Sequence, residues 1–512
     1  MRKKGLIWLM ILMSSCFLIS CRQTSSSEMS SGEEQPEALN VFIVSDTVHL
    51  SGLEEYSEGV YYTTMMNLGD FFSITTQHGS KGHMFYNAFE EYQEQTGIQL
   101  KLHWYEYPEL MEADLEALDE ADLPDLILSN FTSRNDYARY MAEGMFYDLT
   151  ALCEQWEMYS GGSYYQSILH GGEYQDKQYI LPILFNVDTV MGAKRYWAES
   201  GLYLNNTENM GEILDMLIDA QQEKSKDQTA VQFVEASPAY LPYILYGSSG
   251  EQWVDYENGT VNLDQTIFEK MCRFYTQFLK EQLKEENIVP GESLRWAKSK
   301  NLGIIMSINN DVQLDAYLED MGCILEGGGA FKAHLHSAPA QAWYYESRYR
   351  DLGEDFVLAA LPGQNGGTTA HISYFGAVLQ TTKYPEAAFQ FLQYLMDEEV
   401  PAFFGISIKR ENALKQMDYL TSTTYRLRPG TQIPLEDGRV PDSQADYVIQ
   451  PMSGQTKEQL LSMIDEIETV SLPNWPVYAI IEKQLQSCAK GEIEPEEAYQ
   501  NALEDLKEYL QH

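Results

Sequence analysis

The chain has 512 residues and a formal net charge of −43, with 77 acidic side chains against 34 basic ones. Negative charge of this size argues against binding to nucleic acid and against lying flat on an anionic membrane. The length exceeds what one hydrophobic core usually supports, so two lobes or domains are expected.

The N-terminal residues are ordered like a secretory signal. A basic tripeptide at positions 2–4 precedes an apolar run over residues 6–19, which is too short to cross a bilayer comfortably. The run leads to Cys21, and the Leu-Ile-Ser before it resembles the lipobox of bacterial lipoproteins. That resemblance implies a signal peptide over residues 1–20 and a lipid anchor on Cys21, with the rest of the chain on the extracytoplasmic side of the cell membrane. An ordinary thiol at this position is the alternative.

A flexible tether is expected after the anchor, so residues 21–40 are predicted to be the lipidated cysteine and this tether. Residues 22–38 are rich in serine and glutamate and contain almost nothing apolar. Such a segment cannot bury enough surface to fold.

Helix and strand patterns alternate along the remaining chain. Residues 82–96 have apolar side chains at helical spacing, Gly97 ends that helix, and residues 98–104 alternate apolar and polar as a strand. In chain order, the later predicted elements are a strand at 125–128, a helix at 136–143, a strand at 179–184, a helix at 208–222, a strand at 231–234, a helix at 266–286, strands at 302–308 and 356–361, and a helix at 385–396. This order indicates an α/β architecture with mostly parallel sheets.

No catalytic or metal-binding motif is found, so no cofactor and no metal are predicted. His334 and His336 form an isolated pair, and the calcium-loop-like segment that starts at Asp255 has Thr266 where such a loop needs glutamate. The cysteines after the anchor are widely spaced, and their spacing leaves the disulfide state open. They are Cys153, Cys272, Cys323 and Cys488.

Eight segments in order resemble the extracellular solute-binding proteins of ABC importers, in the group that includes maltose-binding protein. The segments are residues 88–98, 123–127, 142–150, 176–182, 247–264, 300–306, 384–400 and 491–498. Each is weak alone, but their order behind a lipobox-like cysteine is specific. Gly192 and Ala193 depart from the Tyr-Asn of the family, and residues 318–353 look like an insertion.

The resemblance implies a two-lobed α/β fold of the periplasmic-binding-protein type, with a hinge and a ligand cleft between the lobes. The predicted crossings between lobes lie near residues 181–183, 359–361 and 406–408. The predicted lobes are 41–181 with 362–407 for lobe one, and 182–361 with 408–512 for lobe two.

Candidate ligand contacts follow from their positions near the ends of the matched segments. They are Asn130, Arg134, Asn186, Tyr240, Trp253, Asn309, Asn310, Trp475 and Tyr478. Amides and guanidinium groups can hydrogen-bond to ligand hydroxyls, and aromatic rings can stack on sugar faces. Packing in the core is the alternative for the aromatic side chains.

The sequence therefore predicts a monomeric, lipid-anchored binding protein and not an enzyme. We expect it to capture a small solute and deliver it to the transmembrane permease subunits of an ABC importer. The expected solute is an oligosaccharide. A lipid-anchored surface glycan hydrolase stays open, because paired carboxylates cannot be picked out by spacing among so many acidic residues. A sensory or adhesive lipoprotein without a transporter also stays open.

Overall fold

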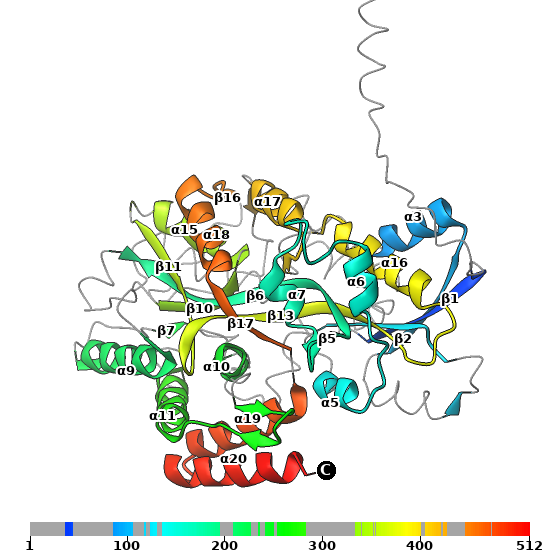
Figure 1. The fold of residues 1–512 in the computed structure, drawn as a ribbon. Helices are drawn as coiled ribbons and strands as arrows, with labels where there is room; N and C mark the ends of the chain where they lie inside the picture. Colours follow the sequence, from blue (N-terminus) through cyan, green and yellow to red (C-terminus); the bar gives the residue numbers. More distant parts are fainter. Residues whose placement is uncertain are drawn as a thin grey trace, which may run out of the picture. The chain divides into compact units, whose positions relative to one another are not determined.

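The computed structural model describes residues 36–44, 85–105, 117–118, 123–130, 136–194, 208–226, 234–235, 241–249, 253–282, 333–338, 340–351, 353, 355–400, 405–420, 423–426, 446–472 and 474–511. The chain divides into a unit of Met1–Pro36 and a unit of Glu37–His512. All elements described below belong to the second unit, and Figure 1 labels them. Cys21 and the predicted signal peptide lie outside the described residues. Within the ranges just given, no helix is long and apolar enough to span a membrane.

One large sheet organises the second unit. Its main path runs β2 (Gln99–Tyr105), β1 (Ala38–Val44), β3 (Leu126–Asn130), β13 (Gly366–Val378), β6 (Ile180–Ala193), β10 (Ala333–Ala338) and β7 (Val234–Glu235). Four more strands join this path, with β11 (Phe356–Ala360) and β14 (Ile406–Ser407) on β6, and β12 (Pro362–Gly363) and β17 (Ile467–Ser471) on β13. The long strands β6 and β13 lie in the middle and connect the two ends of the sheet.

The sheet is mixed, so the expectation of mostly parallel pairing is wrong. β1 pairs in parallel with β2 and β3, β10 with β7, and β13 with β17. In contrast, β6 pairs antiparallel with β10, β11, β13 and β14, and β13 pairs antiparallel with β3 and β12. Helix–strand alternation reports the parallel connections inside each end of the sheet, whereas it says nothing about the direction of long strands that join the ends.

The helices agree well with the sequence patterns. The predicted helices at 82–96, 136–143, 208–222, 266–286 and 385–396 are confirmed as α3 (Tyr86–Thr96), α5 (Tyr137–Ala142), α9 (Met210–Lys226), α11 (Gln265–Gln282) and α16 (Pro385–Asp397). The other helices used below are α6 (Thr150–Gln155), α10 (Leu241–Ser249), α15 (Ala340–Asp351), α17 (Arg410–Asp418), α18 (Gly454–Asp465), α19 (Trp475–Ala489) and α20 (Pro495–Tyr509). The strand predicted at 302–308 lies outside the described residues.

Gly97 ends α3 as predicted. Its φ of 77° is left-handed, and its N–H donates to the Gln93 carbonyl oxygen. A residue with a Cβ would be strained in this conformation, so the glycine allows the chain to leave the helix and enter β2 directly.

Among the described residues, alternation along the strands separates three apolar cores, which we call the shared core, the α5 core and the α11 core. On β1, Val41 belongs to the shared core and the adjacent Phe42 to the α5 core, while on β6 Met191 belongs to the shared core and Val190 to the α11 core. The shared core also contains Phe89, Leu128, Tyr345, Tyr374 and Leu460. The α5 core also contains Ile127, Tyr137, Tyr140 and Phe375, and the α11 core contains Leu245, Trp253, Phe268, Tyr478 and Leu506. Because successive strand residues face opposite sides, the shared core covers one face of the sheet, and two separate cores lie on the other.

The segment expected as an insertion, 318–353, supplies structural parts of this fold. Its described residues form β10, which pairs with β6, and α15, which buries Tyr345 and Tyr349 in the shared core. Trp343 adds a hydrogen bond of 2.7 Å from Nε1 to the Gln450 carbonyl oxygen. Residues 333–351 are therefore integral to the sheet and its packing.

Candidate functional site

Buried and half-buried polar side chains lie where the α5 core and the α11 core approach each other. We call this group the polar seam. It consists of Asp136, Asp188, Tyr256, His371, Asn474 and Tyr509. Polar groups that are removed from water need hydrogen-bond partners. In this group, side chains from elements around the α5 core find partners on elements around the α11 core.

Two helix caps meet at the centre of the polar seam. Asp136 caps α5 by accepting a hydrogen bond from the backbone N–H of Arg139 at 3.0 Å, and Asn474 caps α19 by accepting one from that of Val477 at 3.0 Å. The Asn474 side-chain Nδ2 also donates to Asp136 Oδ1 at 3.2 Å, and the two residues form an isolated antiparallel bridge. The same two side chains thus cap their helices and tie them together.

Two tyrosines complete the environment of Asp136. Tyr256, in the turn between β8 (Val254–Asp255) and β9 (Thr260–Val261), donates to Asp136 Oδ2 at 3.3 Å, and Tyr509 at the end of α20 donates to the same oxygen. Burial raises the pKa of the Asp136 carboxyl, while the hydrogen bonds from Tyr509, the Arg139 N–H and Tyr256 lower it. A carboxylate from the α5 side is therefore held by donors from the α11 side.

A second buried pair lies on the two long strands. Asp188 on β6 and His371 on β13 approach to 3.6 Å between Oδ2 and Nδ1, and their exposed fractions are 1% and 2%. A Cβ at Gly247 of α10 would lie 3.1 Å from Asp188 Oδ2, so glycine lets this helix approach the pair. Burial lowers the pKa of His371, and the Asp188 carboxylate opposes that shift. The imidazole is therefore uncharged at neutral pH.

The described residues around this pair lack the hydrogen bond that activates a nucleophilic serine. Ser248 follows Gly247 on α10, and its buried hydroxyl has no hydrogen-bond partner among the described residues. An activated serine needs a hydrogen bond to its base and access for a substrate. Ser248 has no such hydrogen bond among the described residues. It is also only 1% exposed, so a substrate has no access to its hydroxyl. No cluster of three or more metal-ligating side chains occurs in the part of the chain that the structure describes.

Three of the predicted ligand contacts lie on elements that carry or adjoin residues of the polar seam. Asn130 is the last residue of β3 and pairs in register with Tyr374 of β13. Asn186 is half-buried in β6, two positions before Asp188, and Trp475 begins α19 directly after Asn474. Four further predicted contacts lie outside the described residues: Arg134, Tyr240, Asn309 and Asn310.

Trp253 and Tyr478 lie in the α11 core instead of at an open surface. Their exposed fractions are 0% and 3%, and both rings pack against Tyr246, with centroid distances of 5.9 and 5.6 Å. Trp253 and Tyr478, which were predicted to stack on a sugar, are thus core residues in this structure. Burial of a large aromatic ring stabilises a core strongly. Stacking of a ligand on either one stays a prediction and would require the side chain to leave the core.

The residues of the polar seam escaped the sequence analysis. Asp136 and Asn474 do carry a signal, since each precedes a helical pattern as a capping residue, and Pro476 follows at the start of α19. Nothing in the sequence shows that the two caps meet, because 338 positions separate them. The apparent calcium loop is the β8–β9 turn, in which Asp255 accepts hydrogen bonds from Asn258.

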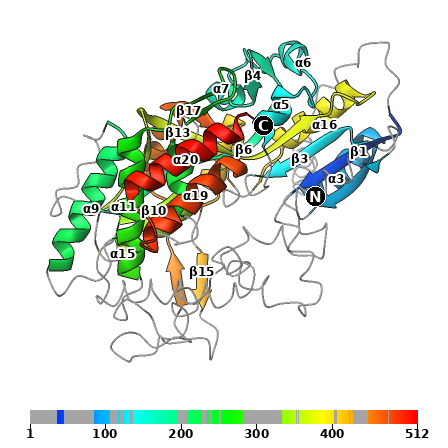
Figure 2. The same cartoon turned by 90° about the horizontal axis from the view of Figure 1, so that it is seen from below.

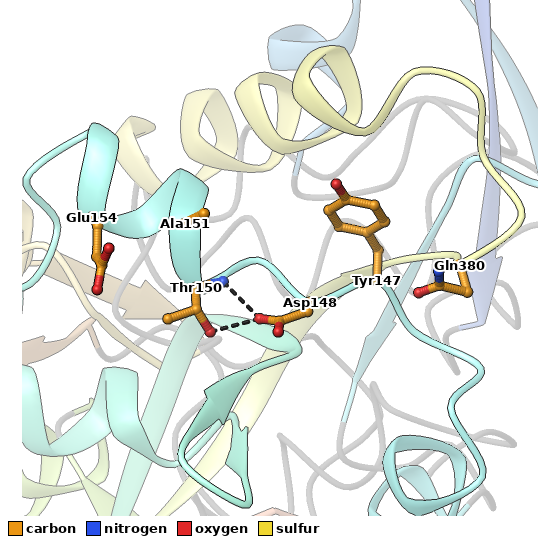
Figure 3. A pocket seen from close by; sticks show the side chains of 6 residues that line it. All are labelled: Tyr147, Asp148, Thr150, Ala151, Glu154 and Gln380. Carbon is orange, nitrogen blue, oxygen red and sulfur yellow. Dashed lines mark hydrogen bonds between the residues drawn. The ribbon is translucent and has the colours of Figure 1, made fainter.

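A surface pocket of about 470 Å³ lies elsewhere, at the start of α6. It is lined by Tyr147, Asp148, Thr150, Ala151, Glu154 and Gln380 (Figure 3). Asp148 accepts hydrogen bonds from the N–H and hydroxyl of Thr150 at 3.1 and 2.6 Å, and it pairs with Lys177 at 3.1 Å. These contacts fix the turn before α6. Two predicted contacts, Asn186 and Trp475, lie on the elements that carry Asp188 and Asn474, whereas none lines this pocket, so we take the polar seam as the candidate site.

Known proteins were compared by sequence and by structure. The sequence profile of the family described as bacterial extracellular solute-binding protein matches residues 80–400. A search of curated proteins finds no match.

Three solved structures are among those similar to this chain. The galacto-N-biose-/lacto-N-biose I-binding protein of an ABC transporter from Bifidobacterium longum, in complex with lacto-N-biose, is 16% identical with a TM-score of 0.49, covering 93% of this chain and 98% of that one. An ABC substrate-binding protein from Listeria monocytogenes, in complex with cycloalternan, is 11% identical with a TM-score of 0.49, covering 93% and 100%. A de novo designed cysteine esterase is 12% identical with a TM-score of 0.50, covering 94% and 99%.

Identities this low concern the fold alone and carry no activity to this chain. The profile match, in contrast, shows family membership, because it spans well over half of the residues. The long strands β6 and β13, with separate cores at their two ends, are the arrangement expected of two lobes joined by a hinge. The protein belongs to the family of bacterial extracellular solute-binding proteins and has their two-lobed α/β fold.

Proposed function

We propose that this protein is the lipid-anchored solute-binding component of an ABC importer, which captures an oligosaccharide outside the membrane and delivers it to a permease. The family match over residues 80–400 is the observation that carries this proposal. Lipidation of Cys21 would keep the binding domain near the permease. A net charge of −43 disfavours anionic solutes, and a neutral sugar needs no charged partner.

The polar seam is proposed as the contact that forms when the two lobes close. Asp136 extends from the α5 side, and its partners Tyr256, Asn474 and Tyr509 come from the α11 side. In a hinge protein, the ligand adds contacts from both lobes and so stabilises the closed state. Contacts between the lobes that involve no ligand also stabilise the closed state, so they set how much stabilisation the ligand must add. The predicted lobe boundaries stay a proposal, and two of the three crossings fall on β6 and β14, which pair with each other.

Asn186 is the strongest proposed ligand contact within the described residues. It is a half-buried amide on a strand that is otherwise largely buried, and it lies two positions from Asp188. An amide can both donate to and accept from sugar hydroxyls. Asn130 and Trp475 are proposed as further ligand contacts, together with Arg134, Tyr240, Asn309 and Asn310.

Isothermal calorimetry of the mature protein with a panel of neutral oligosaccharides, peptides and polyamines tests the proposal. A saturable heat with at least one oligosaccharide is expected. Asn186→Ala should weaken that binding by about 1–3 kcal/mol, because a buried polar group of the ligand loses its partner. Asn501→Ala is the matched control, since Asn501 is a half-buried asparagine on α20, and this variant should bind like the wild type.

Other outcomes discard specific parts of the proposal. Binding of a peptide or polyamine alone would remove the carbohydrate assignment. Conversion of the ligand over hours would favour the surface hydrolase. An absence of permease genes beside this gene would favour a sensory or adhesive lipoprotein.

A further inference from the structure

Two buried thiols face each other in the α11 core. Cys272 lies on α11 and Cys488 on α19, and their exposed fractions are 0% and 5%. The two helices pack side by side (Figure 2), and both side chains lie in the same apolar core, where the two thiols interact with each other. Buried cysteines on packed helices of one core, with thiols that interact, are the starting arrangement for a disulfide between the two helices.

The third described cysteine provides a contrast. Cys153 is also 0% exposed, but it lies in the shared core, where its hydrogen-bond partner is Tyr159. Burial alone therefore does not distinguish the pair, whereas the contact between its two thiols does.

We propose that Cys272 and Cys488 are an oxidisable pair that forms a disulfide between α11 and α19 outside the cytoplasm, with a low-molecular-weight disulfide as the oxidant. The family to which the chain belongs is extracellular, and extracellular compartments are where disulfides form and persist. The inference rests on the fold and the family, and it does not depend on the identity of the ligand.

The chemistry proceeds in two exchanges. Cys488 is the more exposed thiol, and the hydrogen bond from Cys272 lowers its pKa, so Cys488 is the attacking thiolate. It attacks one sulfur of the small disulfide, releases one small thiol and forms a mixed disulfide. Cys272 then attacks the Cys488 sulfur and releases the second small thiol. Two protein thiols and one small disulfide become one protein disulfide and two small thiols.

The disulfide would hold α19 at its C-terminal end. Asn474, which caps the other end of this helix, belongs to the polar seam, so the bond would stabilise the helix that carries one half of that contact. Cross-linking residues that are far apart in sequence also restricts the unfolded chain.

Peptide mapping of the mature protein by mass spectrometry, without reduction, is the direct test. The protein is mapped as isolated and after incubation with oxidised glutathione, with dithiothreitol as the reversing agent. We expect a linked peptide pair containing Cys272 and Cys488, and loss of two titratable thiols from the denatured protein. Cys153 should stay reduced under the same conditions.

Thermal unfolding provides the second readout. Oxidised glutathione should raise the melting temperature of the wild type and of Cys153→Ser. It should leave Cys272→Ala and Cys488→Ala unchanged relative to their own reduced forms. A Cys272–Cys488 pair that stays reduced after oxidant treatment, or a linkage of either cysteine to Cys323, would overturn the proposal. Mapping of the wild type decides the question even if one of these variants fails to fold.

Discussion

Trp253 shows how the environment of one side chain changes what it is expected to do. Its ring is completely buried and packs against Tyr246 and Phe268, with centroid distances of 5.9 and 6.4 Å. Its indole N–H has no hydrogen-bond partner among the described residues. The side chain thus contributes apolar contact area rather than a polar interaction.

Replacement of Trp253 by alanine should therefore reduce stability. The expected loss is about 3–5 kcal/mol in the free energy of unfolding, as for other large aromatic side chains removed from a core. Tyr419→Ala is the control, because Tyr419 is 57% exposed, and its effect should stay within about 0.5 kcal/mol. Urea titration of the ligand-free proteins measures both. Equal stability of Trp253→Ala and wild type would show that this ring is not a core residue.

His371 should make stability depend on pH. Burial lowers its pKa, so the folded protein keeps the imidazole neutral while the unfolded chain takes up a proton below about pH 6.5. The free energy of unfolding should then fall as the pH drops from about 6.5 towards the pKa of the folded state, and level off below it. The slope from this one group is at most about 1.4 kcal/mol per pH unit.

Two variants isolate that effect. His371→Gln should flatten the pH dependence of the unfolding free energy between pH 7 and 5. His170→Gln should preserve it, because the side chain of His170 is 51% exposed. Urea titrations at several pH values measure the slopes. Identical slopes for wild type and His371→Gln would mean that other groups produce the dependence.

At the level of elements, Asn474 combines two roles at the start of α19. It caps the helix through the Val477 N–H, and it donates to the buried Asp136 carboxylate. Ser453 caps α18 through the Thr456 N–H at 3.2 Å and has no link to the polar seam in the described contacts. The two caps therefore allow the capping contribution to be separated from the contribution of the seam.

Asn474→Ala should be clearly more harmful than Ser453→Ala. Loss of a cap alone costs about 1 kcal/mol, which is the expectation for Ser453→Ala. Asn474→Ala should cost about 2–4 kcal/mol, because a buried carboxylate also loses a donor. A double-mutant cycle with Asp136→Ala should show a coupling energy between Asp136 and Asn474. Additive effects of the two substitutions would show that the contact contributes little.

At the scale of the whole molecule, the anchor and the binding domain are expected to be independent. Cys21 belongs to the unit of Met1–Pro36, whereas the described helices and strands belong to the unit of Glu37–His512. Cys21→Ser should abolish lipidation and move the protein from the detergent phase to the aqueous phase on phase separation, or leave an unprocessed precursor. Ligand affinity and melting temperature of the purified domain should not change. Unchanged partition into detergent would rule out the lipid anchor at this position.

Most single elements were predictable, because local sequence carries their signals. The α3 helix, its end at Gly97 and the strand β2 follow from apolar spacing and from a glycine that can adopt a left-handed conformation. The family resemblance likewise rested on short segments that keep their order along the chain. The role of residues 333–351 was missed, since β10 and α15 pack on parts of the chain that are distant in sequence.

The sequence by itself determined the alternation of helices and strands, the charge and the family, because each depends on residue type and local order. Only the tertiary structure decided the directions of β6 and β13, the burial of Trp253 and Tyr478, and the meeting of Asp136 with Asn474. The same is true of the contact between Cys272 and Cys488. Each of these depends on which distant segments share a core, and apolar residues of a cleft and of a core look alike until their neighbours are known.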